Sequence, residues 1–86
     1  RIIIDPSVIT HFVLSIPEVK GCHKIRTRGR KDDIHIDLHL LVDNNMDVQN
    51  AHEIANHVEN TLKKNIPGVS DVVVHIEPAT NILKKT

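Results

Sequence analysis

Apolar and polar residues alternate from residue 34 to residue 40, within the stretch Ile-His-Ile-Asp-Leu-His-Leu-Leu-Val that ends at Val42. Because successive side chains of a β-strand point to opposite faces, this pattern predicts a strand with a core-facing and an outward-facing row. The core-facing row consists of Ile34, Ile36, Leu38 and Leu40. The outward row consists of His35, Asp37 and His39. Two imidazoles and a carboxylate in one row are unusual for a solvated surface.

Two other segments show the spacing of amphipathic helices. The first helix is predicted to start at Asp5, which is an N-cap acceptor, with Pro6 at the first helical position. Pro17 ends this helix. Its apolar stripe consists of Val8, Ile9, Phe12, Val13 and Ile16. Asp47 caps a second helix that runs to about Asn65. The stripe of this helix consists of Val48, Ala51, Ile54, Ala55, Val58, Leu62 and Ile66.

Two further extended segments complete the predicted secondary structure. Residues 25–28 begin a strand, and the charged, glycine-initiated segment 29–33 joins this strand to residues 34–42 as an antiparallel hairpin. After a helix stop at residues 67–68, Pro-Gly, residues 70–77 form a third strand with alternate apolar positions. The predicted order of elements is therefore αββαβ.

The register of the hairpin decides how Asp37 is interpreted. Two registers turn Ile25 and Thr27 toward the core. In one of them, Ile25 lies opposite Leu38. The same register sets Arg26 opposite Asp37, and we interpret Asp37 as the partner in a cross-strand ion pair rather than as a metal ligand.

The remaining histidines differ in their expected surroundings. If the strand that contains Ile25 also included His23, alternation would turn His23 toward the core. We therefore predict that residues 21–23 form an irregular segment that precedes this strand at the open end of the hairpin. His11 and His57 point away from the apolar stripes of their helices and are interpreted as solvated. His35 lies away from the other outward histidines.

The predicted topology gathers ligand-type side chains at one edge of the sheet. A strand-helix-strand crossover is normally right-handed and joins parallel strands, so the last two strands should end at the same edge. His39 lies late in one of these strands, and His75 and Glu77 end the other. The second helix starts at that edge with His52, and His23 enters there because its strand is antiparallel. Each histidine taken singly is also explained as a surface residue, but five potential ligands at one edge favour a metal site. The ligand types alone do not choose among Zn, Co, Ni, Fe and Mn.

The composition restricts the classes of function. Eleven basic residues balance eleven acidic ones, and Phe12 is the only aromatic residue, which argues against a nucleic-acid partner. Cys22 is alone, so we expect a reducing, cytosolic setting without an internal disulfide. No apolar run approaches the roughly 18 residues of a membrane span.

The length indicates one domain. A chain of 86 residues buries only about 60 to 65% of its extended surface, so a partner chain would add stability. We expect the core to cover residues 5–78 and a flexible tail to cover residues 79–86. The first residue, Arg1, is not a methionine, and we interpret residues 1–86 as a single domain cut from a longer protein.

Four motifs follow one another along the chain. They are Gly-Cys-His-Lys-Ile-Arg-Thr-Arg (21–28), Ile-Asp-Leu-His-Leu (36–40), Asn-Ala-His-Glu-Ile-Ala (50–55) and Pro-Gly-Val-Ser-Asp-Val-Val-Val-His-Ile-Glu-Pro (67–78). With these motifs, the chain from about residue 16 to residue 78 resembles the cytoplasmic carboxy-terminal domain of cation diffusion facilitator transporters. The resemblance implies a metallochaperone-like (ferredoxin-like) α+β fold, with two helices on one face of a three-stranded mixed sheet. It also implies a homodimer beneath the transmembrane domain of the same protein, on the cytoplasmic side of the cell membrane.

The resemblance further implies a set of metal ligands. Carried over residue by residue, the family's ligand positions fall on His23, His39, His52 and His75, with the acidic position at Glu77. Members often have aspartate where Glu77 stands, so whether this carboxylate binds one ion or bridges two stays open. The Cys-x-x-Cys motif of copper chaperones is missing, which disfavours Cu(I). The implied cofactor is Zn2+ or another divalent transition metal that biases the dimer toward a transport-competent arrangement.

Three hypotheses of function follow. The leading one is a non-enzymatic, cytosolic dimerisation and metal-sensing domain of a zinc efflux transporter. The alternative is a purely structural dimerisation module whose histidines bind metal incidentally. An enzyme such as a small metallohydrolase is disfavoured, because no nucleophile and base accompany the ligands. Outward Leu41 and Val73 are either apolar dimer contacts or isolated surface hydrophobes.

Overall fold

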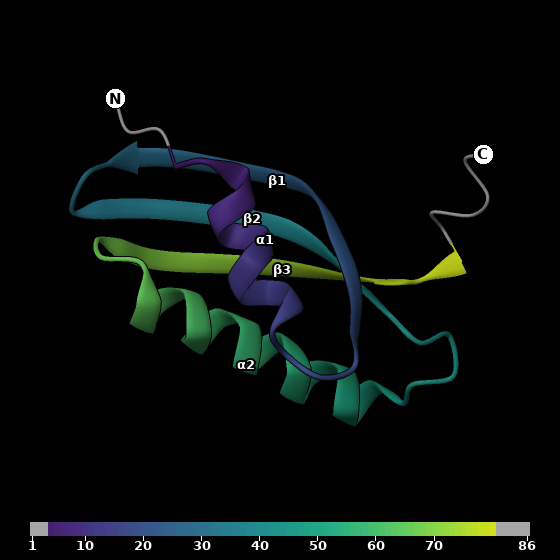
Figure 1. Cartoon of the computed structure of the whole chain (residues 1–86). Helices are drawn as coiled ribbons and strands as arrows, with labels where there is room; N and C mark the ends of the chain where they lie inside the picture. Colours follow the sequence, from purple (N-terminus) through teal and green to yellow (C-terminus); the bar gives the residue numbers. More distant parts are fainter. Residues whose placement is uncertain (1–3, 81–86) are drawn as a thin grey trace.

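The computed structural model describes residues 4–80, which fold into two helices and three strands. In chain order these are α1 (Pro6–Leu14), β1 (Val19–Arg30), β2 (Asp33–Val42), α2 (Val48–Asn65) and β3 (Val69–Pro78). The sheet has the strand order β1-β2-β3, with β1 antiparallel and β3 parallel to β2. Figure 1 shows α1 crossing in front of the strands and α2 running alongside β3. The predicted αββαβ order, mixed sheet and parallel pairing of the last two strands are confirmed.

Both helices begin at the predicted aspartates. The Asp5 carboxylate accepts the backbone N–H of Ser7 at 2.9 Å, and the Asp47 carboxylate accepts that of Asn50 at 2.7 Å. α2 ends at Asn65 as predicted, but α1 ends at Leu14, before the end of its predicted stripe. Neither helix within residues 4–80 is long and apolar enough to cross a membrane.

The core lies between the helices and the inner face of the sheet. Its fully buried large side chains are Ile9, Val13, Ile36, Leu38, Leu40, Val58 and Leu62. Two positions of the predicted helical stripes are exposed instead: Val8 by 41% and Val48 by 72%. Val48 is the first residue of α2, and the buried positions of this helix begin one turn later, at Ala51. The stripe pattern was therefore wrong for the first turn of α2, because helical spacing continues to the end of a helix whereas burial depends on the neighbouring elements.

β1 begins at Val19 and includes residues 21–23, so the predicted lead-in belongs to the strand, but the expected irregularity is present as register shifts on both sides of these residues. His23 is paired with His39, and the next pair is Arg26 with Asp37. Between these two pairs the chain advances by three residues on β1 but by only two on β2. This extra residue is a β-bulge, and Lys24 within it has a positive φ of 52°. The bulge reverses the alternation, so His23 and Arg26 both lie on the outward face although three positions separate them.

The register predicted around Asp37 is confirmed. The Arg26 Nε donates to Asp37 Oδ1 at 3.0 Å, and the two residues are paired across the strands. The bulge interrupts the simple pairing of Ile25 with Leu38 that the same register suggested. Asp37 therefore has an ion-pair partner within its own sheet.

Leu41 lies on the outward face of β2, opposite Glu77 of β3, but it is buried, with 3% exposure, so the prediction that it is an exposed apolar residue was wrong. It is paired with Gly21 of β1, and a Cβ added to Gly21 would lie 3.3 Å from Leu41 Cδ1. The side chain of Leu41 thus fills space that a larger residue at position 21 would occupy. Val73 is 45% exposed, as an outward position of β3 requires.

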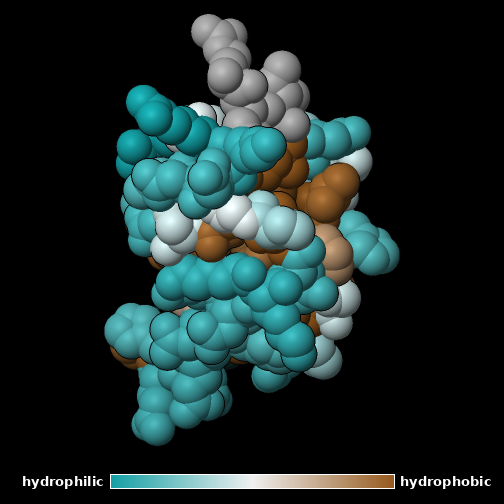
Figure 2. All heavy atoms as spheres, turned by 90° about the vertical axis from the view of Figure 1, so that its left-hand side faces the viewer, coloured by the Kyte–Doolittle hydropathy of each residue, from teal (hydrophilic) through white to brown (hydrophobic). Residues whose placement is uncertain are grey.

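The two ends of the sheet differ in their loops. Gly68, with a φ of 91°, places its α-carbon so close to the hairpin turn that an added Cβ would lie 2.1 Å from the Lys31 carbonyl oxygen. Figure 2 shows this hairpin end as largely hydrophilic, with apolar side chains visible between the layers. At the opposite end, the Ala79 N–H donates to the Val42 carbonyl at 2.8 Å. Most of the predicted flexible tail, residues 81–86, lies outside the described residues.

Candidate metal centre

Three ligand-type side chains from three different strands meet on the outward face of the sheet. His23 comes from β1, His39 from β2 and Glu77 from β3, and one ligand atom of each lies within 4.8 Å of the others. Within residues 4–80, no other set of three histidine, cysteine or acidic side chains brings its ligand atoms within 4.8 Å of one another. The parallel pairing of β2 and β3 brings Glu77 to this end, because both strands finish there.

The Glu77 carboxylate lies between the two imidazoles. Its Oε1 is 3.1 Å from His23 Nε2, and its Oε2 contacts His39 Nδ1. The side chains of His23, His39 and Glu77 are 21%, 26% and 16% exposed, so the group is only partly accessible to water. Each carboxylate oxygen thus holds one ring nitrogen in a partly desolvated site, where charge-assisted contacts are strengthened.

His75 extends this group across the sheet. His39 pairs with His23 on one side and with His75 on the other, so the three imidazoles form a row. The rings of His39 and His75 are stacked, with centroids 4.7 Å apart and planes at 24°, whereas His23 meets His39 edge-on at 5.6 Å. His75 is exposed and is not one of the three groups within 4.8 Å, so it lies beside the cluster rather than in it.

His52 lies apart from the cluster. It is exposed on the second turn of α2, beside a hollow of about 380 Å³ between the start of α2 and the ends of β2 and β3. The lining of this hollow is mostly apolar and includes Val42, Met46 and Ile76. The helix packs on the inner face of the sheet, whereas the cluster occupies the outer face, and this separates His52 from the other predicted ligands.

The other histidines and the cysteine lie outside this centre. His11 and His57 are exposed on their helices, as predicted. The Cys22 sulfur contacts the Thr10 hydroxyl at 3.9 Å on the core side of β1, and burial raises the pKa of its thiol. A thiol held protonated in this way is a poor metal ligand at neutral pH.

The donor set fits a divalent transition metal. Zinc takes imidazole nitrogens and carboxylate oxygens at about 2.0 to 2.2 Å, and two such ligands at a tetrahedral angle lie about 3.3 to 3.6 Å apart. The three donor atoms of His23, His39 and Glu77 already lie within 4.8 Å of one another, so small side-chain rotations bring them to these distances. The carboxylate of Glu77 also supplies a negative charge toward the cation.

Comparison with known proteins agrees with this fold. The family described as "Cation efflux protein, cytoplasmic domain" matches residues 4–79. Metal tolerance protein C1 of Arabidopsis thaliana is 38% identical over 71 residues, which are 83% of this chain and 15% of that protein. The cation-efflux pump FieF of Cronobacter sakazakii is 38% identical over 76 residues, which are 88% of this chain and 25% of that protein.

A solved structure shares the architecture. The C-terminal domain of MamM, in a histidine-to-alanine variant, superimposes with a TM-score of 0.79 at 27% identity, covering 85% of this chain and 91% of that domain. The chain spans a quarter or less of the length of the curated relatives named above. The match to the family extends over almost all of the described residues. The chain therefore belongs to the cation efflux proteins and corresponds to their cytoplasmic domain.

Proposed function

We propose that this domain is a non-enzymatic metal sensor that binds Zn2+, or a similar divalent cation, through His23, His39 and Glu77. The observation that carries the proposal is the sharing of one carboxylate by two imidazoles that come from different strands. His75, stacked on His39, is placed to become a fourth ligand after a rotation of its side chain. In the proposed full-length protein, the domain hangs on the cytoplasmic side of a transmembrane efflux domain.

Metal binding at this cluster replaces protons by a cation. A histidine must present a bare nitrogen to bind metal, so binding releases protons and the affinity falls as the pH drops through about 6.5, the ordinary pKa of imidazole. The bound ion links β1, β2 and β3 at one end of the sheet. It also neutralises the Glu77 carboxylate, which changes the charge of the outward face.

The sensor function requires a second copy of the chain. A ligand shifts an equilibrium only if it binds one state more tightly than the other, so metal must favour one arrangement of a homodimer. The outward sheet face is the proposed contact, because the cluster and the 45% exposed Val73 both lie on it. One solved relative, a MamM C-terminal domain variant, is described as a nickel form, which supports divalent metal binding by this fold.

Calorimetry with the isolated domain tests metal binding. We expect zinc to bind at pH 7.5, with weaker binding at pH 6.0 and at least about tenfold weaker binding in His39→Ala. His57→Ala is the matched control, because it removes an exposed histidine of α2 and should leave the affinity unchanged. Equal affinity in His39→Ala and the wild type would refute the proposed centre.

Small-angle scattering tests the regulatory part. We expect the scattering profile of the dimer to change on saturation with zinc and to stay unchanged in His39→Ala. An unchanged wild-type profile would leave a structural dimerisation module that binds metal incidentally. That alternative also predicts that the double variant His39→Ala/His75→Ala keeps the normal zinc response of the full-length transporter.

A further inference from the structure

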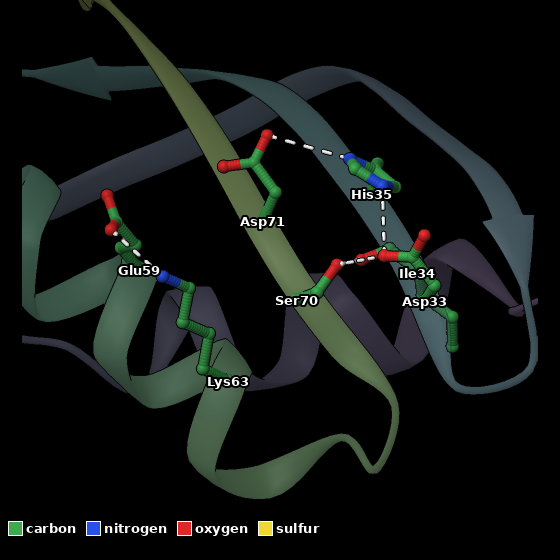
Figure 3. A network of polar contacts seen from close by, with 7 residues as sticks. All are labelled: Asp33, Ile34, His35, Glu59, Lys63, Ser70 and Asp71. Carbon is green, nitrogen blue, oxygen red and sulfur yellow. Dashed lines mark hydrogen bonds and ion pairs between the residues drawn. The ribbon is translucent and has the colours of Figure 1, made fainter.

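A second polar network lies at the other end of the sheet. Figure 3 shows His35 of β2 between Asp33, at the start of the same strand, and Asp71 of β3. His35 Nε2 is 3.1 Å from Asp33 Oδ1, and the Ser70 hydroxyl donates to the same oxygen at 2.6 Å. On the other side of the ring, His35 Nδ1 is 3.7 Å from Asp71 Oδ2.

The hydrogen bonds define which ring nitrogen is available. The pKa of the Asp33 carboxyl is lowered, chiefly by the Ser70 hydroxyl, so Asp33 is an acceptor at neutral pH. When the His35 ring is neutral, an acceptor at Nε2 favours the tautomer that carries its hydrogen on that nitrogen. The bare Nδ1 of that tautomer then faces a second carboxylate, that of Asp71.

Two electron-pair donors that face each other need a cation or a proton between them. The 3.7 Å between Nδ1 and Asp71 Oδ2 exceeds the length of a hydrogen bond. It is close to the separation of about 3.3 to 3.6 Å between two ligands of one zinc ion. A hydrogen bond from the other ring nitrogen to a carboxylate is also the usual way in which a metal-binding histidine is oriented.

We propose that His35 Nδ1 and the Asp71 carboxylate form a second binding site for a divalent transition metal, with Asp33 and Ser70 as positioning residues. The side chains of His35 and Asp71 are 31% and 53% exposed, so water completes the coordination. The site is distinct from the first one, because His35 and His39 are four positions apart on β2, about 13 Å along a strand.

Nearby cations make this site weaker than the first. Arg28 is paired with His35 across the hairpin, and Arg30 is paired with Asp33. Both arginines are exposed, and their charge is screened by solvent. With two protein ligands and this surrounding charge, the site fills only after the cluster of His23, His39 and Glu77.

Nuclear magnetic resonance of the imidazole nitrogens during a Zn2+ titration of the whole domain at pH 7.5 tests the proposal. Without zinc, we expect His35 to be the tautomer with hydrogen on Nε2. With zinc, we expect Nδ1 of His35 to respond in a second phase, after His39, while the exposed His57 does not respond. A His35 ring that is doubly protonated, or that keeps its spectrum in excess zinc, would overturn the proposal.

Asp71→Asn should weaken the response of His35 to zinc at least tenfold while leaving that of His39 unchanged. Asp32→Asn is the matched control, because Asp32 is an exposed acidic residue of the same end. An equal response of His35 in Asp71→Asn and Asp32→Asn would also overturn the proposal. The outcome is independent of the first site, because His35 and His39 give separate signals.

Discussion

At the scale of single residues, Glu77 is the acidic partner of two imidazoles at once. Glu77→Gln keeps the shape of the side chain but removes its charge, so we expect zinc affinity to fall at least about tenfold in calorimetry at pH 7.5. Glu59→Gln is a suitable control, because Glu59 pairs with Lys63 on the surface of α2. Wild-type affinity in Glu77→Gln would show that the carboxylate is no ligand.

Asp33 gives a residue-scale prediction for acid stability. Its pKa is lowered in the folded chain, chiefly by the Ser70 hydroxyl, so this contact stabilises the fold above the unfolded-state pKa of about 3.9. The contribution is lost as the pH falls through the folded-state pKa. In urea unfolding, Ser70→Ala should be less stable than the wild type at pH 6, and the difference should shrink toward pH 3. A difference that is constant over this range would assign the effect of Ser70 to packing.

At the scale of elements, the cap of α2 depends on one side chain. Asp47 accepts the N–H of Asn50, which would otherwise lack an intrahelical partner. Asp47→Ala should lower the free energy of unfolding by about 1 kcal/mol, within the range of about 0.5 to 2 kcal/mol for lost caps. Asp47→Asn should retain most of the stability. Asp32→Ala, at an exposed turn position, should change it by less than about 0.5 kcal/mol.

The bulge of β1 gives a second element-scale prediction. Deleting Lys24 removes the extra residue, so His23 turns away from His39 and Glu77 or the hairpin shifts its register. We expect at least about tenfold weaker zinc binding and a loss of about 1 to 3 kcal/mol of stability. Lys24→Gly keeps the residue and relieves the positive φ, so its zinc affinity should equal that of the wild type. Tight zinc binding by the deletion variant would contradict the role of the bulge.

At the scale of the whole molecule, the outward sheet face should hold two copies together. Val73→Asp places a charge on this face, and we expect the dimer to dissociate at least about ten times more readily in sedimentation equilibrium with zinc. The monomer should stay folded, because Val73 is 45% exposed. Val48→Asp is the matched control on α2, where 72% of the residue is exposed. Equal effects of the two substitutions would exclude the sheet face as the interface.

Much of the fold was predictable because local rules decide it. Alternation identified β2, aspartate caps located the starts of both helices, and the handedness of crossovers gave the parallel pairing of β2 and β3. The ion pair between Arg26 and Asp37 also followed from register and face. Each of these features depends on residues close together in the sequence or on the pairing of two strands. It can therefore be predicted without knowing how the helices pack on the sheet.

The arrangement of the candidate ligands was decided by tertiary structure. Strict alternation would turn His23 inward, so an irregular segment was expected at residues 21–23. The irregularity that turns His23 outward is an extra residue at Lys24, a position that no pattern signals. His52 and Glu77 were predicted at one edge, yet a layer of sheet separates the helix from the outer face.

The order of the elements, their pairing and the end of the sheet at which potential ligands gather all follow from the amino-acid pattern along the chain. Packing between elements is what places some of these ligands on one face and brings Asp33, His35 and Asp71 together at the other end of the sheet. The physical reason is that periodicity fixes direction only within an element. Bulges, layer order and side-chain rotamers depend on packing between elements that are distant in the chain.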